Sequence, residues 1–266
     1  MDAASTKETS TQERNLALSL QGELVNHLLA ALPEDDAPVR AVLVGAHWTV
    51  VCSRHCGLAS TLQKSKPHGE PEVRAAGKLR QMTALELAGL AKSDRWLEAS
   101  VGVAAINSLL DVDERRAVDV NAAEVLVERA PGKCVALVGH FPFIPRLRRS
   151  ARQLWVIEQQ PAPGEYAADA AADLIPRADL VALTGSALIN HTLDNLLGLC
   201  RADAEVMVLG ASTPLSPVLF EHGVTILSGA KVTDEAAVLR LAGEGATFRQ
   251  MHGVRLLTLQ RGGSAS

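Results

Sequence analysis

Two apolar segments, each followed by small polar residues, lie close together in the C-terminal half of the chain. The region from Val206 to Asp234 reads VMVLGASTPLSPVLFEHGVTILSGAKVTD. Its aliphatic runs at 206–209 and 224–227 predict two buried strands, and the Gly, Ser, Thr and Pro residues after each run predict loops. Open α/β sheets usually bind ligands at the carboxyl ends of their strands. We therefore expect this region to belong to such a sheet and to border a small-molecule site.

Strand and helix patterns alternate along the rest of this half. Further strands are predicted at 134–138, 154–158, 180–183 and 254–259, and helices at 122–129, 190–200, near 218 and at 234–241. This alternation predicts βαβ units and a doubly wound parallel sheet. Aromatic residues make up only 3% of the chain and hydrophobic residues 47%, so the core should be aliphatic. The predicted fold class is α/β.

The N-terminal half shows a different pattern. Leucines at every fourth position across 16–32 predict an amphipathic helix. Residues 40–52 predict a hairpin or a bulged strand with a break at 45–47. Thr83 and Glu86 form a capping-box signature, and a Gly- and Ala-rich helix follows through VGVAAINSLLD. This half is predicted to be a small α+β unit.

A charged run, VDERRAVD, separates the two halves. The predicted organisation is a flexible tail at 1–13, a small α+β domain at 14–115, a sheet domain at 116–261 and a second tail at 262–266.

Charge and hydropathy argue against several partners. The net charge of −4 and the absence of basic stretches with interleaved aromatics disfavour nucleic acid. No apolar run reaches the length of a membrane span and the N-terminus is polar, so we expect a cytoplasmic protein without a membrane partner. Four cysteines are too few and too unevenly placed for a disulfide framework.

The predicted strand ends at 138 and 158 carry the first candidate site residues. The loop after residue 138 has Phe141 and Pro142 where a dinucleotide-binding turn needs glycine, which disfavours that mode. His140 can be a metal ligand, an acid/base or a donor to an anion. Glu158 lies 19 residues after Gly139, where Rossmann proteins place a ribose-binding acid, but a solvated carboxylate is an equally good interpretation.

Hydroxyl and amide side chains follow the next predicted strands. Such groups at a helix start can bind an anion or simply cap the helix. The candidate ligand-binding residues here are Thr184, Ser186, Asn190, Ser212 and Thr213. A fourth loop at 228–231 is predicted to add Ser228, Gly229 and the charge of Lys231. Pro214 stands where a GxSxG nucleophile elbow needs glycine, so Ser–His–Asp chemistry is not supported.

The small domain offers two further candidates. Cys52, His55 and Cys56 place three soft-metal ligands within five residues, but without a second ligand pair a chance cluster is the better interpretation. Asn107 lies in an otherwise apolar helix, where a buried amide requires partners and can present them to a cleft.

Several motifs resemble a bacterial and archaeal family described as putative heavy-metal chelation proteins. The resemblance is strongest in GASTPLSPVLFEHGV and SGAKVTD, and the GHF loop, His47-Trp48-Thr49 and Asn107 also match. It implies an enolase-N-terminal-like domain followed by a Rossmann-like domain, with His140 as a site residue. The resemblance is weaker through the cysteine-rich loop, and it implies no metal ligation by Cys52, His55 or Cys56.

Our leading hypothesis is a homodimer that binds a small anionic or metal-chelating ligand between its two domains. His140 and Glu158 would coordinate a transition metal ion or move a proton, and Asn107 would face them from the small domain. The alternative is a transferase or lyase that uses a nucleoside-containing cofactor. A binding or metal-delivery protein without turnover fits the same residues, so the sequence does not decide whether the protein is an enzyme.

Overall fold

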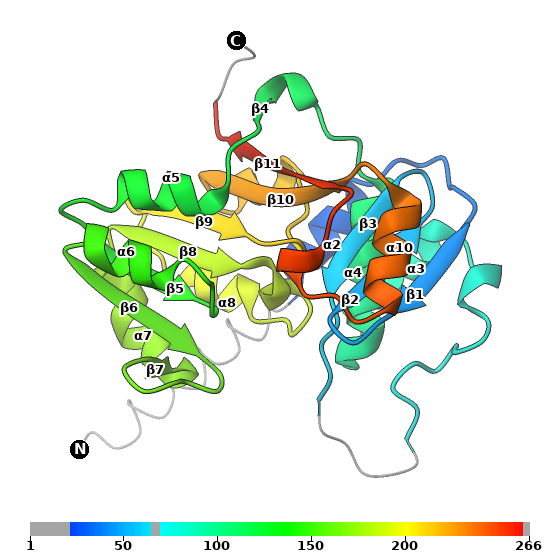
Figure 1. The fold of residues 1–266 in the computed structure, drawn as a ribbon, viewed down its shortest axis with the longest axis horizontal. Coiled ribbons are helices and arrows are strands. Elements are labelled where there is room, and N and C mark those ends of the chain that lie inside the picture. Colours follow the sequence, from blue (N-terminus) through cyan, green and yellow to red (C-terminus); the bar gives the residue numbers. More distant parts are fainter. Residues whose placement is uncertain (1–21, 65–69, 263–266) are drawn as a thin grey trace, which may run out of the picture.

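The computed structural model describes residues 22–64 and 70–262. Figure 1 shows a large sheet with helices on both faces beside a small sheet with its own helices. The predicted tail at 1–13, Leu16 and Leu20 of the predicted first helix, and residues 263–266 lie outside the described residues. No helix in the described ranges is long and apolar enough to cross a membrane.

The large sheet has eight strands in the order β4-β11-β10-β9-β8-β5-β6-β7. The strands are β4 (Ala117–Val118), β5 (Cys134–Val138), β6 (Gln153–Glu158), β7 (Tyr166–Ala167), β8 (Leu180–Thr184), β9 (Glu205–Leu209), β10 (Ile226–Val232) and β11 (Val254–Gln260). Strands β5 to β10 pair in parallel, whereas β11 is antiparallel to β10 and β4. The predicted α/β class with a mostly parallel sheet is confirmed.

Alternate residues of each strand pack against helices on opposite faces of this sheet. Val135 and Leu137 contact a cluster that includes α5 and α6, whereas Ala136 between them belongs to the cluster on the other face. The helices that cover the sheet are α5 (Ala122–Arg129), α6 (Ile144–Ser150), α7 (Ala171–Leu174), α8 (Leu193–Gly198) and α9 (Val218–Glu221). With both faces covered, the strands are almost continuously apolar, which is why the sequence predicts them well.

The chain reverses its winding direction between β5 and β8. From β5 it adds β6 and β7 on one side, and it then returns to place β8, β9 and β10 on the other side. The loops after β5 and β8 therefore diverge at adjacent strand ends. Such a switch point leaves a crevice at the carboxyl edge of the sheet, where ligands of open α/β proteins bind.

The small sheet consists of β1 (Ala41–Val44), β2 (Trp48–Cys52) and β3 (Cys56–Ser60), all antiparallel. It packs against α4 (Trp96–Leu109), which lies beside α3 (Ala84–Gly89). Thr83 and Glu86 form the predicted capping box of α3. A Cβ on Gly57 would lie 2.0 Å from the Ala104 carbonyl oxygen, so β3 approaches the backbone of α4 closely.

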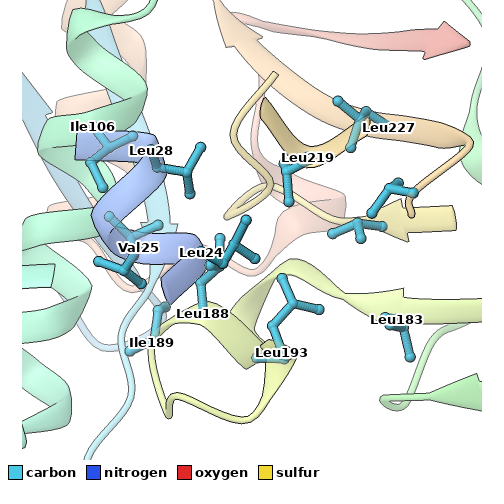
Figure 2. Packing of buried hydrophobic residues seen from close by; sticks show 14 of the residues in the cluster. Leu24, Val25, Leu28, Ile106, Leu183, Leu188, Ile189, Leu193, Leu219 and Leu227 are labelled. Atoms are coloured by element: carbon cyan, nitrogen blue, oxygen red, sulfur yellow. The ribbon is translucent and has the colours of Figure 1, made fainter. Parts of the chain in front are cut away.

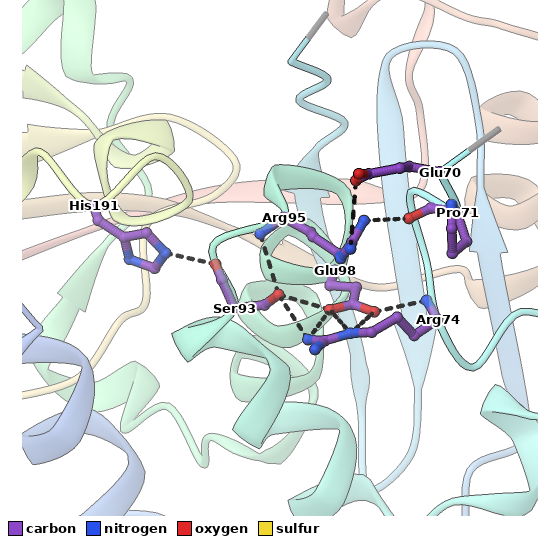
Figure 3. A network of polar contacts seen from close by, with 7 residues as sticks. All are labelled: Glu70, Pro71, Arg74, Ser93, Arg95, Glu98 and His191. Atoms are coloured by element: carbon purple, nitrogen blue, oxygen red, sulfur yellow. Dashed lines mark hydrogen bonds and ion pairs between the residues drawn. The ribbon is translucent and has the colours of Figure 1, made fainter. Parts of the chain in front are cut away.

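Two helices join the small sheet to the large one. Helix α2 (Glu23–Ala30) places Leu24 and Leu28 between Ile106 of α4 and the helices of the large sheet (Figure 2). Helix α10 (Glu235–Gly243) comes from the C-terminal half but packs on β1 and β2. His191 adds a polar link through Nε2, which lies 2.7 Å from the carbonyl oxygen of Ser93 (Figure 3).

The structure differs from the sequence predictions in several elements. The predicted loop at 228–231 is wrong, because Ser228, Gly229 and Lys231 lie within β10, which pairs with β11 along its whole length. The predicted helix at 190–200 is shorter, because residues 189–191 form a turn in which His191 has a φ of 59°, and α8 begins only at Leu193. Strand β3 and helix α6 were not predicted.

Candidate functional site

A cavity of about 660 Å³ opens at the carboxyl edge of the large sheet. Its floor comes from the ends of β5, β6, β8 and β9, represented by Gly139, Glu158, Thr184 and Leu209. The first turn of α5 and residues of β2 and β3 complete the wall. The cavity thus lies at the switch point and is bordered by both sheets.

Aromatic side chains are concentrated around this cavity. The chain has four Phe, three Trp and one Tyr, and half of these residues line the cavity: Trp48, Phe141, Phe143 and Phe248. Phe141 and Phe143 are stacked with ring centroids 5.1 Å apart, and Trp48 and Phe248 form a tilted pair at 5.5 Å. Two aromatic pairs in a chain so poor in aromatics provide faces for a planar or apolar ligand.

Two arginines contribute positive charge to the same cavity. Arg146 extends from α6 and Arg249 from the 3-10 turn Phe248–Gln250. Neither guanidinium forms an ion pair with another side chain in the described part of the protein. Exposed guanidiniums beside aromatic walls suit a carboxylate or phosphate, to which arginine can donate two hydrogen bonds.

His140 is held by a carboxylate that sequence analysis missed. Its Nδ1 lies 2.9 Å from Oε1 of Glu165, whose other oxygen accepts a hydrogen bond from the Ala162 amide. That amide lowers the pKa of Glu165, and His140 adds to this effect against the opposing influence of burial. A neutral His140 that donates from Nδ1 to Glu165 keeps Nε2 as an acceptor, able to bind a cation or take a proton.

Hydroxyl groups line the side of the cavity nearest β8 and β3. Thr184 Oγ1 and Ser186 Oγ are 2.9 Å apart at the end of β8. Ser212 accepts a hydrogen bond from the Ser60 amide and is bonded to the Ser60 hydroxyl at 3.1 Å. Ser212 therefore connects the loop after β9 to the small sheet as well as lining the cavity.

Six of the predicted site residues line the cavity: His140, Glu158, Thr184, Ser186, Ser212 and Ser228. The others lie elsewhere. Asn190 accepts hydrogen bonds from the Thr192 amide and hydroxyl. Thr213 is 2% exposed and fills the space beside Gly185 and Gly229. Asn107 donates to the carbonyl oxygens of Leu58 and Ser212, which ties α4 to the β3 strand and the loop after β9.

One group of side chains in the described ranges gathers three or more potential metal ligands, and it lies outside the cavity. It consists of Cys52, Cys56 and Glu235, whose ligand atoms are all within 4.8 Å of one another. His55 is not a member of this group, and its Nε2 lies 2.7 Å from Oδ1 of Asp111. The hydrogen bond with the Cys56 sulfur raises the pKa of the Cys52 thiol, and burial raises it further. His140 and Glu158 are not part of this or any other such group among the described residues.

The comparisons with known proteins agree with this architecture. A family described as putative heavy-metal chelation matches residues 121–259, and a second family of the same description matches residues 25–110. The chain belongs to the first of these families. The resemblance expected from GASTP, SGAKVTD and the GHF loop is therefore confirmed.

Proteins similar to this chain come from several organisms. An uncharacterized protein of Methanocaldococcus jannaschii is 29% identical over 156 residues, which is 56% of this chain and 60% of that protein. A protein of unknown function from Desulfitobacterium hafniense has a solved structure with a TM-score of 0.79 and 28% identity, covering 90% of this chain and 98% of its own. A Pyrococcus horikoshii protein with a TM-score of 0.71 and 22% identity, covering 91% of this chain and 99% of its own, has the same fold.

Proposed function

We propose that the cavity at the sheet edge binds a small planar or apolar anion that chelates a metal ion, and that the metal enters as cargo of this ligand. The observation that carries the proposal is the pairing of four aromatic side chains with Arg146 and Arg249 around one cavity. Aromatic faces would hold the body of the chelator, and guanidiniums would hold its carboxylates. The description of the family as metal-chelating supports the same ligand class.

His140 and Glu158 are proposed to act on the bound chelate. Nε2 of His140, oriented through Glu165, would bind a metal position that the chelator leaves open. Glu158 would add a carboxylate oxygen as a second protein ligand, since carboxylates and imidazoles both bind transition metals. Thr184, Ser186 and Ser212 would orient the ligand by hydrogen bonds. Asn107 would act indirectly, because it holds the Ser212 loop.

Calorimetric titration with free and with nickel-bound dipicolinate tests this proposal. Dipicolinate is a planar aromatic dicarboxylate that chelates metal ions. Arg146→Ala should weaken binding by about 10- to 100-fold, the effect of losing a hydrogen bond to a charged group. Arg149→Ala is the matched control, because this arginine is exposed on the same helix and does not line the cavity. Succinate, which lacks the ring, should bind more weakly. Equal affinities for the two arginine variants would contradict the proposal.

A nucleoside-containing cofactor is the second candidate, for a transferase or lyase. Glu158 at the end of β6, within the cavity that Phe141 also lines, supports it. Adenosine in the same titration separates the two candidates, because adenosine has no carboxylate and carries no metal, so it should bind only if the cavity accepts a nucleoside. His140→Ala separates enzyme from carrier, since an enzyme should lose turnover and keep part of its affinity, whereas a carrier should lose affinity alone.

A two-domain boundary near residue 115, a homodimer and a cytoplasmic location stay predictions. Sedimentation of the purified chain tests the homodimer, and fractionation of the source cells tests the location. No nucleic acid or membrane partner is proposed.

A further inference from the structure

Three side chains with metal-binding chemistry meet at the end of the small sheet that lies away from the cavity. Cys52 and Cys56 are directly opposite each other where the β2–β3 hairpin closes. Their sulfurs are 2.7 Å apart. Glu235 is more than 170 residues away in sequence but begins α10, which packs on this hairpin, so its carboxylate lies within 4.8 Å of both sulfurs.

The surroundings of this cluster are apolar on one side and open on the other. Cys52 is fully buried and belongs to a core cluster with Val50, Leu58 and Val238. Cys56 is half-buried and lines a pocket of about 110 Å³. Asn107, whose Oδ1 is buried without a hydrogen-bond partner in the described structure, lines the same pocket. An ion bound here would be shielded by the core yet reached through the pocket.

Charge balance favours a divalent cation. Two thiolates and one carboxylate carry three negative charges, and Arg40 supplies one positive charge through its ion pair with Glu235 at 2.5 Å. A doubly charged ion neutralises the remainder. Arg40 leaves one oxygen of Glu235 for the ion, because its pair is with Oε2.

We propose that Cys52, Cys56 and Glu235 form a binding site for a thiophilic divalent cation of the zinc type, with a fourth position open to solvent or a small ligand. Zn–S bonds of about 2.3 Å in a tetrahedron place two sulfurs about 3.8 Å apart, so the cysteines must open by about 1 Å. Rotation of the half-buried Cys56 can provide this movement. On binding, the two thiols release their protons to solvent and the ion exchanges its waters for two sulfurs and one oxygen.

This site shares no lining residue with the cavity of the proposed function and does not depend on it. Its donor set also differs, because two sulfurs select zinc-type or softer ions over magnesium and calcium. A chelate bound in the cavity would leave the cysteine site unchanged. The two proposals can therefore fail separately.

Cobalt titration of the reduced full-length protein tests the site, because Co²⁺ bound by thiolates shows an intense sulfur-to-metal charge-transfer absorption. We expect this absorption to saturate at one ion per chain and to disappear when Zn²⁺ is added. Cys56→Ser should remove the charge-transfer intensity in large part and weaken zinc binding by about 100-fold or more, since even outer ligand partners change affinity by about 10- to 100-fold. Glu235→Gln should weaken binding and retain the sulfur absorption.

Cys200→Ser is the matched control. Cys200 is a partly buried thiol outside the cluster, and serine can keep its hydrogen bond to the Leu196 carbonyl. This variant should bind cobalt and zinc as the original protein does. Circular dichroism of Cys56→Ser and Glu235→Gln establishes that each variant is folded. The proposal is overturned if the reduced protein shows no charge-transfer absorption, or if Cys56→Ser and Cys200→Ser bind zinc equally.

Discussion

At the scale of single residues, Glu98 shows how this protein accommodates a buried charge. Its side chain is 2% exposed. Its oxygens accept hydrogen bonds from the Arg74 amide and guanidinium and from the Ser93 hydroxyl (Figure 3). Burial alone would raise the pKa of this carboxyl, but the Arg74 and Ser93 donors reverse the effect and lower it to about 2. The charge is thus kept because its partners satisfy it.

This lowered pKa predicts a specific dependence of stability on pH. The carboxyl titrates at 4.5 when unperturbed and at about 2 in the folded protein. Its contribution is therefore complete above pH 4.5 and is lost as the pH falls toward 2. Glu98→Gln should cost about 2 to 3 kcal/mol at neutral pH and should flatten the pH dependence in this range. Urea unfolding at neutral and acidic pH measures both.

Glu244→Gln is the control for this experiment, because Glu244 is exposed and forms no ion pair in the described structure. It should leave the unfolding free energy within about 0.5 kcal/mol of the original. If the unfolding free energy of Glu98→Gln changed with pH as it does in the original protein, the hydrogen bonds from Arg74 and Ser93 would not stabilise the charged form of Glu98.

Site residues were predictable from sequence where their position depends on local chain geometry. His140, Glu158 and Thr184 each follow an apolar run, and the carboxyl ends of parallel strands meet at one edge. Glu165 and Arg249 have no such local signal. Each reaches the cavity region through a loop or turn whose path depends on the completed fold, so the sequence could not connect them with His140.

At the scale of elements, features set by neighbouring residues were predicted correctly, whereas the length of a strand depended on the strand that pairs with it. The capping box of Thr83 and Glu86 acts over three residues and was visible in the sequence. Strand β10 was predicted too short because Ser228, Gly229 and Lys231 are typical loop residues. Pairing with β11 nevertheless extends the strand to Val232. Helix α6 was missed because Pro145 stands in its first turn and only Ile144 and Leu147 are buried.

The contact between β3 and α4 predicts different effects of adding a methyl group at two glycines. Gly57→Ala would place its Cβ 2.0 Å from the Ala104 oxygen and 2.4 Å from the Ser108 amide nitrogen. These are backbone atoms, so the hairpin must shift, and we expect a loss of about 1 to 3 kcal/mol or more. Gly89→Ala has open space around its Cβ and helical angles, and should stabilise the protein by about 0.5 to 1 kcal/mol. Thermal and denaturant unfolding of both variants compares them, and a destabilised Gly89→Ala would contradict this interpretation.

At the scale of the whole molecule, α2 connects the cores of the two halves. Leu24, Val25 and Leu28 belong to the same buried cluster as residues of α4, α8 and α9 (Figure 2). The Leu24 amide also donates a hydrogen bond to Asp194 in the first turn of α8. Because one apolar cluster extends through both halves, we expect them to unfold together.

Leu28→Ala tests this coupling. Leu28 is 1% exposed, so its truncation should destabilise the protein by about 2 to 5 kcal/mol while unfolding stays a single transition. Asn26→Ala, at an exposed position of the same helix, should change stability by no more than about 0.5 kcal/mol. Single-tryptophan variants that keep only Trp96, near the small sheet, or only Trp155, in the large sheet, report the two halves separately. Two separated transitions in the original protein would contradict the coupling.

The position of α10 has a consequence for how the chain is made. The hairpin of β1 and β2 leaves the ribosome early, but the helix that covers it is encoded by residues 235–243, near the end of the chain. Domains generally fold as units during synthesis, with N-terminal ones first. Here the apolar side chains of Val50 and Leu58 stay without their partners Val238 and Ala242 until translation is almost complete. One face of β2 and β3 is therefore among the last surfaces to be buried, although their other face packs on α4 of the same half.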